Sequence, residues 1–201
     1  ETHCDLDSGT FIIDLFNKRW AMDLGVEQQT YHSGYRFDYY RKRAEGHNVV
    51  IFNPDVIDDQ NKYAVAEINR FEHNADTTIM VSDLSKVHEY KGAQKVIRGI
   101  KMDKINRSVL IQDEVVMKKP SEMYWFMHTL QDAKISDDGK TVILTQKGNP
   151  LNYVTLEFMC NTKIEVSIVP AKSLPSSPHP DKMTDDSANK KIAVKIKSAN
   201  P

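Results

Sequence analysis

Short runs of alternating apolar and polar residues dominate the chain, and turn residues separate them. Residues 48–52 are apolar and β-branched, for example, and Asn53-Pro54-Asp55 ends that run. The same pattern predicts strands at residues 9–15, 19–23, 64–71, 77–82, 95–101, 108–117, 122–129, 141–146, 153–159, 163–169 and 192–197. Many short strands without long helical periodicity predict an all-β fold, a multi-stranded antiparallel β-sandwich of stacked sheets.

Two segments depart from this pattern. Residues 83–90 predict a short helical turn that Asp83 caps. Residues 171–189 are rich in Pro, Ser, Asp and Lys, and three prolines between 175 and 180 exclude a central strand there. We therefore expect a single domain, in which residues 1–170 form the β-sandwich and residues 171–201 add a surface loop and the final strand.

Composition limits the classes of ligand. The 201 residues carry a formal net charge of -1, and no basic stripe of the kind that binds nucleic acid is visible, so a local cluster would have to hold any acidic ligand. No apolar run approaches the roughly 20 residues that a membrane span requires. The chain begins at Glu1 and its densest cluster of reactive side chains follows at once, so we expect it to be part of a longer protein.

That cluster combines imidazoles with carboxylates. His3, Asp5 and Asp7 alternate, so an extended chain places them on one side. If neighbouring strands bring Asp23 and His47 to the same place, these groups form a site for a divalent metal. The residues alone leave a second interpretation open, a hydrogen-bonded His–Asp pair at the surface or half-buried, without a metal.

Three motifs occur in a fixed order along the first quarter of the chain. They read His3-x-Asp5-x-Asp7-x-Gly9-Thr10-Phe11, then Trp20-Ala21-Met22-Asp23-Leu24-Gly25, then Arg41-x-Arg43-x-x-Gly46-His47-Asn48. They resemble the H-x-H-x-D-x-G-S-F, aromatic-Ala-x-Asp-x-Gly and R-x-R-x-x-G-H-N-T motifs of the heparinase II/III-like polysaccharide lyases. Three motifs in this order are more specific than any one of them. The resemblance is strongest over residues 3–54 and faint after about residue 171.

The resemblance implies the C-terminal β-sheet portion of such a lyase, without the N-terminal α/α toroid. Family members cleave uronic-acid polysaccharides, such as heparin, heparan sulfate or related glycans, by β-elimination in a cleft between toroid and β-sheets. His3 matches the catalytic His of the β-sheet portion. The toroid supplies the remaining catalytic groups, so we expect the isolated chain to be inactive, with an acidic polysaccharide and the toroid as its partners. Family lyases of this kind are periplasmic or secreted in bacteria.

The resemblance also implies a metal site at Asp5, Asp23 and His47. Asp5 stands where the family motif has a His, which makes the ligand set harder and more anionic. Zinc is the first expectation, with calcium or manganese as alternatives.

Four residues of the loop between the second and third motifs are candidate substrate contacts. Tyrosine faces stack on sugar rings and guanidinium groups pair with carboxylate or sulfate, so we select Tyr31, Tyr35, Arg41 and Arg43. The alternative is that the tyrosines pack the sheet edge and the arginines are solvated. His128 is instead expected to be a hydrogen-bonded core residue of a central strand.

A second function remains open from the sequence. The departure at Asp5 is compatible with a non-catalytic glycan-binding or structural β-sandwich module.

Overall fold

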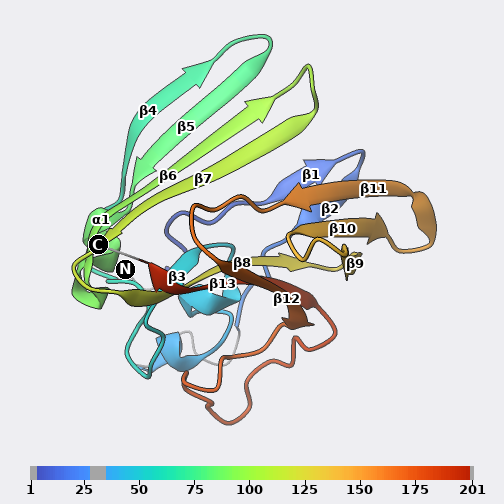
Figure 1. The fold of residues 1–201 in the computed structure, drawn as a ribbon. Coiled ribbons are helices and arrows are strands. Elements are labelled where there is room, and N and C mark those ends of the chain that lie inside the picture. The colour runs from blue at the N-terminus through green and yellow to red at the C-terminus, as the bar shows by residue number, and fades with distance from the viewer. Residues whose placement is uncertain (1–3, 28–34, 200–201) are drawn as a thin grey trace.

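The computed structural model describes residues 4–27 and 35–199. In this part of the chain the strands form four antiparallel sheets with almost no helix, which confirms the predicted all-β class (Figure 1). The smallest sheet is the hairpin of β1 (Ile13–Leu15) and β2 (Lys18–Ala21). Residues 9–12, which the alternation assigns to a strand, are loop instead, because Gly9 has a φ of +86° and turns the chain.

A four-stranded sheet with the order β12-β13-β8-β3 lies at the centre of the molecule. Its strands are β3 (Val50–Phe52), β8 (Ser121–Thr129), β12 (Ile164–Pro170) and β13 (Lys190–Ala199). The last strand, β13, therefore runs between β12 and β8 in the middle of the sheet rather than along its edge. The proline-rich loop of residues 171–189 connects β12 to it.

A second four-stranded sheet projects from the body of the molecule (Figure 1). It contains β4 (Glu67–His73), β5 (Thr77–Asp83), β6 (Ala93–Asp103) and β7 (Ser108–Met117) in that order. The helical turn predicted between β5 and β6 is present as α1 (Ser85–His88) with a 3-10 turn (Glu89–Lys91). The Ser85 amide donates to the Asp83 carboxylate at 2.8 Å, so Asp83 supports the start of this turn.

The third sheet contains β9 (Asp132–Ile135), β10 (Thr141–Gln146) and β11 (Asn149–Glu157). β9 was not predicted from the sequence, because its four residues alternate over only two polar–apolar pairs. β11 is an edge strand, which is why it accommodates Pro150.

The two faces of β8 divide the core. Phe126 packs on one face against Leu6, Phe37, Val49 and Ile51. Met127 packs on the other face in a cluster that contains Phe11, Trp20, Val142, Leu144 and Ile192. Because side chains alternate along a strand, His128 lies on the Phe126 side. The motif segments pack on both faces, since Leu6 and Ala44 lie on the Phe126 side and Phe11 and Trp20 on the Met127 side.

Candidate functional site

One tight turn precedes the third motif and another lies within it. The chain passes through 3-10 turns at Arg36–Asp38 and Ala44–Gly46 before it enters β3. A Cβ atom at Gly46 would lie 2.0 Å from the backbone oxygen of Tyr40, so only glycine fits where these two stretches of backbone touch. This close approach places His47 and Asn48 just before β3.

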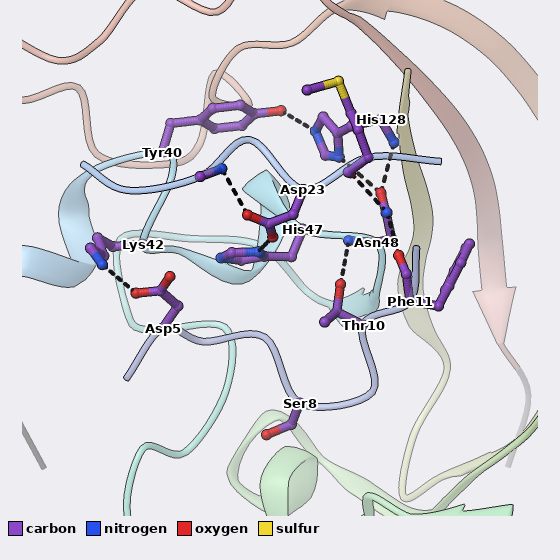
Figure 2. Close-up of polar contacts among 12 residues, drawn as sticks. Asp5, Ser8, Thr10, Phe11, Asp23, Tyr40, Lys42, His47, Asn48 and His128 are labelled. Atoms are coloured by element: carbon purple, nitrogen blue, oxygen red, sulfur yellow. Dashed lines mark hydrogen bonds and ion pairs between the residues drawn. The ribbon is translucent and has the colours of Figure 1, made fainter. Parts of the chain in front are cut away.

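Asn48 joins all three motif segments (Figure 2). Its side-chain amide donates to the backbone oxygens of Phe11, at 2.7 Å, and Met22, at 3.0 Å. Its side-chain oxygen accepts from the backbone amide of His128 at 2.7 Å, and its own backbone amide donates to Thr10 Oγ1 at 3.3 Å. Asn48 is fully buried. Three stretches that are remote in sequence therefore meet at one side chain.

Arg98 connects this meeting point to the projecting sheet. Its guanidinium donates to the backbone oxygens of Gly9, at 2.7 Å, and Asn48, at 2.9 Å. The other side of the same guanidinium forms two hydrogen bonds with the Asp113 carboxylate. One buried side chain on β6 thus holds the first and third segments against β7.

His47 and Asp23 form the pair that the motifs predict. Asp23 Oδ2 lies 2.9 Å from His47 Nδ1, and Asp23 Oδ1 accepts from the Gly25 amide at 2.7 Å. The hydrogen bond with His47 holds the pKa of Asp23 below its usual value. Because Nδ1 is engaged by the carboxylate, Nε2 is the ring nitrogen left for another partner. That atom is buried and has no hydrogen-bond partner within the described residues.

His128 is a buried, hydrogen-bonded residue of β8, as predicted. The Tyr40 hydroxyl lies 2.7 Å from Nε2, and Asn48 Oδ1 lies 3.2 Å from Nδ1. An amide oxygen only accepts, so Nδ1 carries the proton and Nε2 accepts from the Tyr40 hydroxyl. Burial holds the pKa of His128 well below its usual value, so the ring is neutral and serves as structural support.

Asp5 and Asp7 complete the acidic cluster. Asp5 Oδ1 lies 2.6 Å from Lys42 Nζ, and the Lys42 side chain is only 7% exposed. Burial raises the pKa of Asp7, with smaller raising effects from the charges of Asp5 and Asp23 and a lowering effect from His47. Asp5, Asp23 and His47 are therefore close enough to Asp7 for their charges to act on it.

The three predicted metal ligands do not form one donor set in this arrangement. Asp23 and His47 are paired, whereas Asp5 is paired with Lys42. No three His, Cys, Asp or Glu side chains of the described ranges stand close enough together to hold an ion. The metal stays a prediction from the sequence, and no step of the function proposed below is routed through it.

The predicted catalytic and substrate residues have different surroundings. His3 and Tyr31 lie outside the described residues. Tyr35 is 77% exposed and presents its ring at the surface. Arg41 forms a two-fold hydrogen bond with Asp186 and so fastens the 171–189 loop.

Arg43 is sealed from solvent. Its guanidinium donates to the backbone oxygens of Asp55 and Ile57 and to the Asp59 carboxylate. The side chains of Arg43 and Asp59 are both 0% exposed. In this arrangement Arg43 holds the 55–59 loop, and a polysaccharide at the surface does not reach it.

Several cations and rings near the first segment were not identified from the sequence. Arg36 Cζ lies 4.6 Å from the centre of the Phe37 ring, and Lys62 Nζ lies 5.1 Å from the same ring. Tyr63 beside Lys62 is 85% exposed. Arg36 also donates to Cys4, the sequence neighbour of His3, at 3.0 Å. No local pattern links residues 36 and 62, because their proximity is created by the fold.

An apolar cavity of about 460 Å³ lies elsewhere. It is lined by β7, by the end of β11 and by residues such as Trp125 and Met127. Phe11 of the first motif also lines it, so the cavity borders the first motif segment, on the face of β8 opposite to His128. Among the described residues, no helix has the length and apolar character that crossing a bilayer takes.

Comparison with solved structures gives a likeness of fold. The chain superposes on the heparan sulfate lyase HepC from Pedobacter heparinus with a TM-score of 0.64 and 12% sequence identity. A mutant of that lyase gives 0.63 and 13%. In both cases the alignment covers 98% of this chain and 31% of the lyase chain, so this chain spans about a third of the length of the lyase. No family model matches the sequence, and no curated protein does. The chain thus has the fold of one part of that lyase.

Proposed function

We propose that this chain is the β-sheet portion of a polysaccharide lyase that cleaves uronic-acid-containing glycans by β-elimination. The observation that carries the proposal is the junction at Asn48, where three motif segments meet, with the His47–Asp23 pair beside it. The likeness of fold to a heparan sulfate lyase supports the same assignment. Heparan sulfate and related acidic glycans are therefore the proposed substrates, and the periplasm or the cell exterior the proposed location.

In this proposal His3 contributes to the removal of the C5 proton of the uronate. As that proton leaves, the electron pair of the C5–H bond forms the C4–C5 double bond. The bond between C4 and the glycosidic oxygen breaks at the same time, and the departing oxygen takes up a proton. Neutralising the uronate carboxylate makes C5 more acidic. A helical toroid domain supplies the other catalytic groups, so the chain alone has no lyase activity.

The glycan contacts are proposed at the surface beside Cys4. Arg36 touches Cys4, and both Arg36 and Lys62 lie over the Phe37 ring, so two cations stand close to the described start of the first segment. Tyr35 and Tyr63 present exposed rings that suit stacking on sugar faces. Guanidinium and ammonium groups pair with the carboxylates and sulfates of such glycans.

Glycan binding by the chain tests this proposal. Titration calorimetry with heparan sulfate, chondroitin sulfate and alginate is compared with neutral dextran. We expect binding to at least one uronate polymer, none to dextran, and weaker binding after Lys62→Met. Lys118→Met is the matched control, because Lys118 is also exposed but lies on the turn before β8. Failure to bind any uronate polymer refutes the proposal.

A second function is favoured by one observation. Asp5 is engaged by Lys42 where the family motif has a His, which suits a glycan-binding module without catalysis. The longer protein separates the two functions. His3→Ala abolishes the appearance of unsaturated uronate ends if it is a lyase, whereas a binding module yields no such ends before or after the substitution.

A further inference from the structure

The Asp5–Lys42 ion pair stands where the motif predicts the third metal ligand. The carboxylate and ammonium are 2.6 Å apart, and both side chains are largely buried, at 22% and 7% exposed. The backbone repeats this link, because the Leu6 amide donates to the Lys42 oxygen at 2.9 Å. Lys42 is thus joined to the first segment through both its main chain and its side chain.

The charge of the cluster explains why a cation is required there. An aspartate at position 5 adds a negative charge where a neutral imidazole adds none, and the charged partner that the structure gives it is the Lys42 ammonium. A partly buried carboxylate is stabilised by a positive group beside it. An ammonium has three donors and no acceptor, so it engages carboxylate oxygens much as a cation does.

We propose that the Lys42 ammonium takes the place of a divalent metal ion in this centre. The first and third segments are then tied by an internal cation, and the centre folds without metal. His47 Nε2 and the carboxylate of Asp23 remain as donors, the former buried and without a hydrogen-bond partner in the described part of the chain. Removing the ammonium should therefore uncover a divalent-cation site that the unchanged protein does not offer.

Elemental analysis and thermal melting test this inference on the protein purified without a chelator. We expect the unchanged chain to carry no stoichiometric metal and to melt at the same temperature with EDTA, Zn²⁺ or Mn²⁺. Lys42→Met should lower the melting temperature by roughly 4–8 °C, since it leaves Asp5 without its partner. Added Zn²⁺ or Mn²⁺ should restore that loss. Lys62→Met is the control, because the Lys62–Asp58 pair is more exposed, and it should show neither effect.

Three results would overturn the inference. They are one metal ion per unchanged chain, a lower melting temperature of the unchanged chain in EDTA, and a folded Lys42→Met variant that gains no response to cations. If Lys42→Met does not fold, Asp5→His replaces it. That variant completes a His–Asp–His set and should take up one zinc ion per chain, and failure to do so also overturns the inference. Because none of these measurements involves a glycan, their outcome is independent of the proposed function.

Discussion

Truncation of Asn48 should destabilise the whole domain, although the residue belongs to a motif region rather than to the apolar core. Asn48→Ala removes the donors to the backbone oxygens of Phe11 and Met22 and the acceptor of the His128 amide. Each of these groups is then buried without its partner, which costs about 1–3 kcal/mol per group. The surrounding backbone relaxes in part, so we expect a loss of about 3–5 kcal/mol in the free energy of unfolding.

Urea unfolding followed by the fluorescence of the two tryptophans measures this loss. Trp20 and Trp125 both pack in the cluster around Phe11, so their emission reports the state of the core next to the junction. The midpoint should fall while the slope with urea stays constant, as expected for a change in stability alone. Asn152→Ala is the matched control. Asn152 lies on the edge strand β11, and its side-chain amide donates to the Gln146 side chain. This substitution should cost about 1 kcal/mol or less.

Asn48→Asp makes the test specific for the two donated hydrogen bonds. The substitution keeps the size of the side chain and the acceptor for His128, but it turns an oxygen towards the carbonyls of Phe11 and Met22. A protonated aspartic acid regains one donor, so this variant should gain stability relative to the unchanged protein as the pH falls. If Asn48→Ala and Asn152→Ala unfold at the same urea concentration, the junction does not hold the motif segments together and the reasoning fails.

Further predictions concern the groups around the junction. Gly46→Ala should destabilise by more than about 3 kcal/mol, since its Cβ meets a backbone oxygen 2.0 Å away, and a native-like urea midpoint would contradict this. Tyr40→Phe should cost about 1–2 kcal/mol, because Nε2 of His128 loses its donor, and calorimetric melting checks it. Burial raises the pKa of Asp59 from 3.8 to about 7, against the pull of Arg43. The folded chain then holds a proton that the unfolded chain has released, so stability falls as the pH rises from about 4 to about 7. Urea midpoints measured across this pH range should therefore depend less on pH in Asp59→Asn than in the unchanged chain. If the pH dependence is the same in both, groups other than Asp59 cause it.

The fold class was predictable because β-strands leave a strong local signal. The runs at residues 108–117 and 122–129 have strand composition throughout, and β7 and β8 match them within one residue. β9 was not found because four residues carry too little periodicity. The position of β13 in the middle of the central sheet was not visible either. Sheet order depends on pairings between distant strands, which alternation within one strand does not specify.

The site was predictable only where a motif fixed both residue type and spacing. The Asp23–His47 pair follows from two motifs that converge. Lys42, by contrast, occupies a variable position of the third motif between Arg41 and Arg43, and its ion pair with Asp5 depends on how two loops cross. The burial of Arg43 could not be predicted from the sequence either, because its partners at residues 55–59 lie beyond the motif. Sequence patterns thus identified the chemical groups better than their partners.

Charged side chains fasten several loops in and around the motif segments. Arg98 fastens residues 9 and 48 to the projecting sheet, Arg43 fastens the 55–59 loop, and Arg41 fastens the 171–189 loop. Apolar packing alone would leave the backbone oxygens of such loops without donors, at a cost for each buried group. A guanidinium reaches several of these oxygens at once while its carboxylate partner balances the charge. Such networks favour one arrangement of the loops. In the Arg43 network, Arg43 Nε and Nη1 and Asp59 Oδ2 stay buried without a hydrogen-bond partner among the described residues. A lysine in place of a metal ion at Asp5 follows the same rule, since the chain supplies its own cation at each point where a loop must be fixed.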